Sequence, residues 1–145
     1  MSQTPWTVRS LKAALDDAPG TGADELSVRV LEGSDPILLV TMHWHGDLEI
    51  YVSVSDQQVA CSALLWPVDE QEDRHAFNEF LLKAQKLVPL SNFGISAVGG
   101  RDYYELFGEL STTTSIEDIV IELRTLAENA IEAASDLRTS FSSAA

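Results

Sequence analysis

The sequence predicts an α+β fold, in which a mainly antiparallel sheet carries its helices on one face. Segments with the alternating pattern of strands follow one another in groups, which favours hairpins and antiparallel pairing. Three segments with helical spacing lie near the start, the middle and the end of the chain. With 145 residues, 45% of them hydrophobic, the chain has the material for one core. We expect one domain over residues 1–145, with the order α-β-β-β-β-α-β-β-α and a disordered tail at about residues 139–145.

The first helix and the first strand are predicted between residues 8 and 32. Val8, Leu11 and Leu15 recur at helical spacing, and residues 19–22 ("PGTG") end this helix. Residues 26–32 ("LSVRVLE") then alternate apolar and polar side chains, as half-buried strands do.

Three further strands are predicted before the middle helix. Residues 37–45 and 48–55 form a hairpin around Gly46-Asp47, and residues 58–66 form the fourth strand. A slip of one residue would place the two apolar sets of the hairpin on opposite faces, so burial selects the register that matches them. The predicted buried set is Leu38, Val40, Met42, Trp44, Leu48, Ile50, Val52 and Val54.

Two histidines, His43 and His45, lie one residue apart at the end of the first hairpin strand. Residues two apart in a strand share a face, as a His-x-His metal pair requires. The matched register pairs Met42 with Ile50 and places Glu49 opposite His43, which would bring the three polar side chains together.

The stretch "HWHGDLE" matches the core of the cupin metal motif, and the alternative function is therefore a small metal-dependent, cupin-like enzyme using His43, His45 and Glu49. The glycines that flank the cupin motif are missing. The only other histidine, His75, lies near the start of a helix, so a second cupin motif is absent. We expect no metal and no other cofactor, and we interpret this stretch as a solvated or partner-facing strand surface.

The middle helix is predicted from a capping pattern. Pro67 ends the fourth strand, Asp69 and Glu72 have the spacing of a capping box, and Pro89 ends the helix. Its expected apolar stripe is Phe77, Phe80, Leu81, Ala84, Leu87 and Val88.

A second hairpin and a long helix complete the prediction. Residues 93–98 and 102–110 pair across Gly99-Gly100, since paired glycines favour a tight hairpin turn. Ser115 is the expected N-cap of the last helix, and acidic residues 117–118 lie in its first turn, where the helix dipole favours anions.

The charge of the chain excludes several classes of partner. Its 23 acidic and 9 basic residues give a net charge of −14. Binding to nucleic acid or to anionic membranes needs clustered Lys and Arg, so we expect neither. The N-terminal "MSQTPWTVRS" lacks the apolar core of a signal peptide, and the longest apolar runs fall short of the roughly 20 residues that span a bilayer. We expect a cytoplasmic protein without direct membrane insertion.

The chain shows no convincing catalytic constellation. Its one cysteine, Cys61, leaves no internal disulfide and fits a reducing compartment. Cys61 lies in the middle of a predicted strand, where a buried, inert thiol is expected. No phosphate-binding glycine motif occurs.

The segment "RDYYELFGELS" holds the expected partner-binding residues. If Tyr104 and Leu106 belong to the core, Tyr103 and Phe107 stand on the other face beside carboxylates. Exposed aromatic side chains surrounded by charge are typical of contact surfaces, and packing of Tyr103 and Phe107 under the final helix is the alternative. Gly108 within this strand indicates a bulge or a close backbone approach.

Residues 103–111 ("YYELFGELS") and 115–133 ("SIEDIVIELRTLAENAIEA") resemble the C-terminal signature of the YjfI family, a bacterial family also called domain of unknown function 2170. The resemblance extends over nearly the whole chain. The family has no assigned catalytic residues, so none is transferred. Members are often encoded beside phage-shock-protein-A-like proteins, which implies a role in envelope stress or as an accessory to such a protein.

The order of elements also resembles the type III secretion chaperone-like fold, although an extra strand precedes the middle helix. Proteins with that fold are small, acidic and usually dimeric, and they bind protein partners, so the resemblance implies a homodimer as one option. We therefore expect a non-enzymatic, acidic protein-binding module with a chaperone-like role. Its expected partner has a basic surface, with a phage-shock-protein-A-like protein as the candidate, and Tyr103 and Phe107 are the expected anchors.

Overall fold

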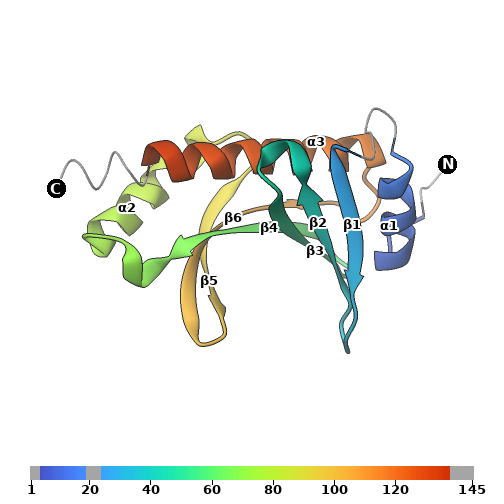
Figure 1. The fold of residues 1–145 in the computed structure, drawn as a ribbon, viewed down its shortest axis with the longest axis horizontal. Helices are drawn as coiled ribbons and strands as arrows, with labels where there is room; N and C mark the ends of the chain where they lie inside the picture. The colour runs from blue at the N-terminus through green and yellow to red at the C-terminus, as the bar shows by residue number, and fades with distance from the viewer. Residues whose placement is uncertain (1–3, 19–23, 138–145) are drawn as a thin grey trace.

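The structure is a computed structural model that describes residues 4–18 and 24–137 (Figure 1). The predicted helix end at residues 19–22 and the predicted tail at residues 139–145 both lie outside the described residues. The order of elements confirms the α-β-β-β-β-α-β-β-α prediction. The elements are α1 (Val8–Asp16), β1 (Leu26–Leu31), β2 (Ile37–Met42), β3 (Leu48–Val54), β4 (Val59–Pro67), α2 (Arg74–Ala84), β5 (Asn92–Val98), β6 (Arg101–Leu110) and α3 (Ile116–Glu132).

The strands form one six-stranded antiparallel sheet in the order β1-β2-β3-β4-β6-β5. The first four strands follow one another as a meander. The connection through α2 then carries the chain past β4, so that β6 returns beside β4 and β5 becomes the outer edge. The predicted antiparallel sheet is confirmed.

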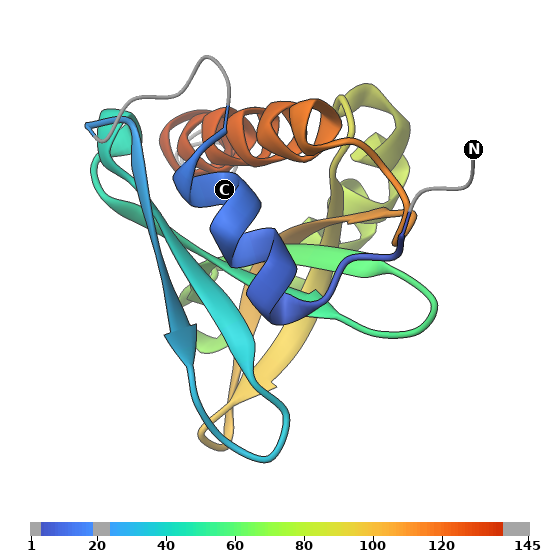
Figure 2. The same ribbon diagram turned by 90° about the vertical axis from the view of Figure 1, so that its right-hand side faces the viewer.

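All three helices lie on one face of this sheet, as predicted. α3 runs along the sheet, with α1 at one end and α2 at the other (Figures 1 and 2). The core fills the space between the helices and the sheet. Its fully buried members include Leu11, Leu38, Ile50, Val52, Cys61, Phe77, Leu106, Ile119, Leu123 and Leu126.

The other face of the sheet carries no helix among the described residues. In Figure 1 the β1–β2 and β5–β6 hairpins both extend to the side away from α3, so that the sheet curves between them. We call this the open face. It carries the side chains that alternate with the core positions along each strand.

The β2–β3 hairpin confirms the predicted faces but not the predicted register. Met42 pairs with Leu48, and Val40 pairs with Ile50, so the apolar sets still share a face. β2 ends at Met42, because the chain then forms a 3₁₀ turn at His43–His45, followed by Gly46 in the left-handed region (φ 66). The loop thus spans residues 43–47 instead of three residues. The predicted burial of Trp44 is wrong, since its side chain is 61% exposed on this turn.

The predicted start of the middle helix is also wrong. Asp69 lies in a 3₁₀ turn at Val68–Glu70, and α2 begins at Arg74. The physical reason is an ion pair: Arg101 donates two hydrogen bonds to Asp69, at 2.9 and 2.7 Å, and a third to Glu70 at 3.0 Å. These bonds hold the pKa of Asp69 below its usual value. The carboxylate that was expected to cap α2 instead fastens the β5–β6 hairpin to the end of β4.

The second hairpin and the last helix follow the prediction. Val98 pairs with Arg101 across a two-residue turn, in which Gly99 and Gly100 both have positive φ values of 61° and 80°. These values suit glycine, because a side chain rarely adopts them. The side chain of Ser115 accepts a hydrogen bond from the backbone of Asp118 at 3.1 Å, as an N-cap does.

Candidate functional site: the open face of the sheet

The structure places the two predicted anchor residues on the open face. On β6, Tyr104 and Leu106 are buried toward the helices, whereas Tyr103 and Phe107 are half-buried on the opposite side. α3 packs on the Tyr104 side, so the alternative that Tyr103 and Phe107 pack beneath it is wrong. Glu105 lies between them on the same face.

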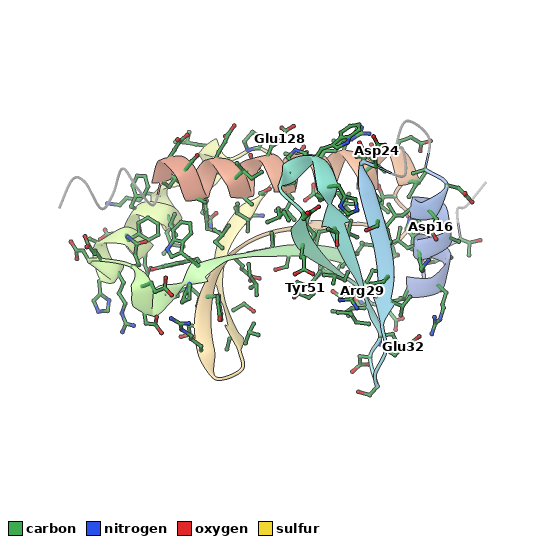
Figure 3. The ribbon with its side chains drawn as sticks, in the orientation of Figure 1. Asp16, Asp24, Arg29, Glu32, Tyr51 and Glu128 are labelled. Carbon is green, nitrogen blue, oxygen red and sulfur yellow. The ribbon has the colours of Figure 1, made fainter. Side chains whose placement is uncertain are left out.

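A hollow of about 390 Å³ lies on the open face. Residues of five strands line it, from Ile37 on β2 and Tyr51 on β3 to Val98 on β5. Figure 3 places Tyr51 on the side of the sheet away from α3. The lining therefore joins the two hairpins across the centre of the sheet, and Glu105 contributes a carboxylate to it.

Glu105 and Phe107 share the space above Gly94. Ser62 Oγ donates a 2.6 Å hydrogen bond to Glu105 Oε2. A Cβ added at Gly94 would lie 2.9 Å from Phe107 Cε1 and 3.2 Å from Glu105 Oε1. Phe107 thus covers the glycine of an edge strand, which gives it a structural role beside any role in binding.

The second predicted anchor, Tyr103, lies beside a cation. The Arg101 guanidinium lies 5.9 Å from the centroid of the Tyr103 ring, within the range of a cation–π contact. Because Asp69 and Glu70 also hold Arg101, the position of Tyr103 is tied to the junction between β4 and α2.

Carboxylates outnumber cations on the open face. The alternation of the strands places Glu49, Glu105 and Glu109 on it, together with Arg29 on β1 and the paired Arg101. The excess of negative charge seen in the whole chain is therefore present on this face too.

The predicted meeting of His43, His45 and Glu49 is not observed. His43 and His45 lie on the 3₁₀ turn instead of a strand, and Glu49 pairs with Thr41 instead of lying opposite His43. His45 Nδ1 is buried without a hydrogen-bond partner among the described residues. Within residues 4–18 and 24–137, no group of three or more His, Cys, Asp or Glu side chains is placed to hold a metal ion.

His43 instead belongs to a hydrogen-bonded chain that the sequence did not suggest. Its Nδ1 lies 2.7 Å from Asp47 Oδ1, and its Nε2 lies 3.0 Å from Ser27 Oγ. Serine hydrolases use this connectivity with a buried aspartate. Here the Asp47 side chain is 73% exposed, so water screens its charge. We interpret these hydrogen bonds as structural contacts that hold the turn against β1. The sequence contains no local pattern that predicts them, because Ser27 lies 16 residues from His43.

Cys61 has the inert environment that was predicted. It is fully buried, and burial together with the nearby Glu122 raises the pKa of its thiol to about 12. Glu122 is itself 5% exposed, its Oε1 has no hydrogen-bond partner among the described residues, and burial raises the pKa of this carboxyl. A Cβ added at Gly108 would lie only 1.7 Å from Glu122 Oε1, which confirms the predicted close approach at this glycine.

A second surface, formed by α2 and β5, was missed because its apolar residues were assigned to the core. Phe77 and Leu81 are buried as predicted, but Phe80 is 39% exposed and Leu87 is 82% exposed. A groove of about 330 Å³ lies between α2 and β5, and Leu82 and Ile95 contribute to its lining. We call it the α2–β5 groove.

No helix of the described part of the chain is long and apolar enough to cross a bilayer.

The chain belongs to the family described as "Uncharacterized protein conserved in bacteria (DUF2170)", whose model matches residues 5–141. It is 35% identical over 129 residues to the uncharacterized protein YjfI of Escherichia coli K12, which covers 89% of this chain and 92% of YjfI. YjfI of E. coli O157:H7 matches to the same extent. The family resemblance seen in the sequence is thereby confirmed.

Two solved structures share the fold at low sequence identity. YbjN, a proposed transcription regulator from E. coli, superposes with a TM-score of 0.65 at 11% identity, covering 92% of this chain and 95% of YbjN. A chain of the ExsC–ExsE complex superposes with a TM-score of 0.51 at 12% identity, covering 90% of this chain and 93% of that one. The likeness to the type III secretion chaperone-like fold is thus confirmed, as a likeness of fold.

Proposed function

We propose that the chain is a non-enzymatic, acidic protein-binding module, and that the open face receives its partner. The observation that carries this proposal is the open face itself, a curved sheet surface with a hollow, two half-buried aromatic side chains and a carboxylate between them. In a sheet whose helices all lie on the other side, this combination matches the aromatic anchors and polar surroundings of protein interfaces.

The charge of the chain supports a partner rich in Lys and Arg. At −14, the molecule attracts such a surface over a range of about 8 Å at physiological salt. Complementary charge mainly accelerates encounter, while apolar contacts hold the complex once it has formed. Association should therefore slow several-fold as salt rises.

The comparisons support protein binding at the level of fold. ExsC and ExsE were solved as a complex of two proteins, and this chain shares its fold with one chain of that complex. The specific form of the proposal is a chaperone-like role toward a phage-shock-protein-A-like envelope-stress protein. The chaperone-like role follows from the fold resemblance, and the partner follows from the family resemblance. Such a protein is the first partner to test.

For the homodimer, which stays a prediction, we propose the outer edge of β5 as the contact. Gln85 donates to Phe93 O at 2.8 Å and accepts from Phe93 N at 2.7 Å, so its amide takes the place of a neighbouring strand. Outward-facing backbone groups recur at every second residue, which leaves those of Ile95 and Ala97 for pairing. The strand contains no charge or proline to protect this edge. If this edge pairs two copies, Ile95→Lys should halve the mass seen by light scattering; an unchanged mass would contradict the contact.

The experiment that tests the proposed function compares two double variants. Tyr103→Ala/Phe107→Ala removes the aromatic side chains of the open face. The matched control, Ile121→Ala/Ile131→Ala, removes exposed apolar side chains of α3. Both should fold, as circular dichroism and urea unfolding would show.

We expect only the open-face variant to lose its partner in pull-downs with a phage-shock-protein-A-like protein and with native lysate, read by mass spectrometry. Equal recovery of the same partners by wild type and the open-face variant would contradict the proposal.

A further inference from the structure

The hollow on the open face carries a single carboxylate. Its volume is about 390 Å³, and its lining is otherwise made of apolar and hydroxyl side chains. Ile37, Leu64 and Val98 form apolar parts of the lining, whereas Tyr51 contributes an aromatic ring. The carboxylate belongs to Glu105, which therefore presents one negative charge within largely apolar walls.

The carboxylate of Glu105 keeps unused hydrogen-bonding capacity. A carboxylate accepts up to about four hydrogen bonds. Among the described residues, Glu105 accepts one, from Ser62 Oγ to Oε2 at 2.6 Å. Its other oxygen, Oε1, would lie 3.2 Å from a Cβ added at Gly94, beside the Phe107 ring, and accepts no hydrogen bond from the described residues. Ser62 thus fixes the orientation of the group while leaving acceptor positions for a ligand.

Among residues 4–18 and 24–137, no Lys or Arg forms an ion pair with Glu105. Arg101 is held by Asp69 at 2.7 Å and by Glu70 at 3.0 Å, at the far end of β6. Arg29 lies on β1, and β2, β3 and β4 separate that strand from β6. The neighbouring charges on this face, Glu49 and Glu109, are themselves negative. Within the described part of the chain, the charge of Glu105 therefore has no counterion, so a cationic group of a partner could complement it.

We propose that this hollow receives an arginine side chain from a basic segment of the protein partner. A guanidinium donates several hydrogen bonds in one plane, which suits an oriented carboxylate. Its face stacks on aromatic rings such as that of Tyr51, and its methylene stem packs on apolar walls such as Leu64. The inference rests on the proposed function, since it assigns the chemistry that the open face recognises.

The test uses short synthetic peptides as probes. The reference peptide alternates valine and threonine, which favours an extended chain, and carries one central arginine. Three matched peptides replace that arginine by lysine, by citrulline (a neutral isostere) or by glutamate. Binding to the full chain is measured by NMR titration. We expect affinity to fall in the order arginine, lysine, citrulline and glutamate, with shifts centred on Ser62, Gly94 and Glu105.

Two variants assign the effect to the carboxylate. Glu105→Gln can still accept the hydrogen bond from Ser62 but lacks the charge, so it should bind the arginine peptide about tenfold more weakly and no longer distinguish it from the citrulline peptide. The control is Glu128→Gln, which makes the same change in net charge on α3, on the opposite side of the sheet (Figure 3). It should bind as the wild type does.

Equal affinities of the wild type for the arginine and citrulline peptides, or an unchanged affinity in Glu105→Gln, would overturn the inference. So would shifts confined to the α2–β5 groove. A protein partner that Tyr103→Ala/Phe107→Ala loses and Glu105→Gln retains would overturn this inference alone and leave the protein-binding module standing. Discrimination between the peptides, with no protein partner bound at the open face, would contradict the proposed function instead.

Discussion

The two faces of the sheet use the same strands for different purposes. On β6, Tyr104 and Leu106 are buried toward the helices, and Tyr103, Glu105 and Phe107 face the other way. The helix-covered face is apolar, and burial there disfavours the charged form of the Glu122 carboxyl and raises its pKa. The open face combines half-buried aromatic rings with a carboxylate fixed by a hydroxyl.

This difference shows how one alternating strand can serve both folding and recognition. A strand with period two gives each face its own composition, so the core residues determine stability without determining what the open face binds. Variants on adjacent residues of one strand should therefore have different effects.

The largest expected effect comes from adjacent residues of β6. Leu106 is fully buried against the helices, so Leu106→Ala should lower the free energy of unfolding by about 2–5 kcal/mol, the usual cost of a cavity in a core. Phe107→Ala on the open face should cost about 1 kcal/mol, since that ring is only half-buried. Urea unfolding of the two variants measures both values, and similar losses would break the distinction between the faces.

Two glycines provide a second pair. Gly108 faces α3, where an added Cβ would lie 1.7 Å from the buried carboxyl of Glu122, whereas Gly94 faces the ring of Phe107 on the open face. Gly108→Ala should destabilise the fold by about 1–3 kcal/mol, as overpacking does in cores. Gly94→Ala should cost less, because the half-buried ring can move. Thermal unfolding compares them, and a larger loss in Gly94→Ala would contradict this account.

The buried carboxyl should make stability depend on pH. Burial raises the pKa of Glu122 above its ordinary value of 4.5, so the unfolded state releases this proton first as pH rises. The contribution of Glu122 is therefore most favourable below pH 4.5 and declines as pH rises through the raised pKa. Glu122→Gln mimics the neutral acid and should be more stable than the wild type at neutral pH.

The measurement is the difference in unfolding free energy between wild type and Glu122→Gln over a pH series. The difference should shrink toward acidic pH. A constant difference would show that the pKa of Glu122 is the same in the folded and unfolded states, which would contradict the raised pKa.

The smallest effects concern the turn at residues 43–47. Because Trp44 is 61% exposed, Trp44→Ala should change the free energy of unfolding by less than about 0.5 kcal/mol, in contrast to a core tryptophan. A loss of several kcal/mol in urea would indicate that the turn packs against the fold.

The same turn carries His43 and His45, two of the residues proposed for the alternative metal-dependent enzyme. Protein purified without chelator should carry far less than one equivalent of transition metal by elemental analysis. Near-stoichiometric metal that a His43→Ala/His45→Ala variant loses would revive the cupin-like enzyme.

The sequence allowed the order of elements and the faces of the strands to be predicted, because apolar alternation reports burial directly. Met42 shares a face with Leu48 and Ile50 as expected, although the register is different. The turn at His43–His45 was missed, since "HWH" continues the alternation of β2 while its backbone leaves the strand. Alternation alone does not show where a strand ends.

The candidate site was only half predictable. Tyr103 and Phe107 could be placed on the face opposite Tyr104 by alternation alone. The bond from Ser62 to Glu105 joins residues 43 positions apart, and the sequence contains no local signal for it. Likewise, the capping pattern at Asp69 gave no indication that Arg101 would take this carboxylate, because that ion pair depends on how the second hairpin returns to the sheet.

The central claim is that the partner occupies the open face, and site-specific photo-crosslinking tests it most directly. A benzophenone side chain is placed at position 103 on the open face or, in a second protein, at position 121 on the exposed side of α3. The account predicts crosslinks from position 103 to a protein rich in Lys and Arg, weakened by high salt, and none from position 121. Crosslinks from position 121 with none from position 103, or none from either, would contradict it.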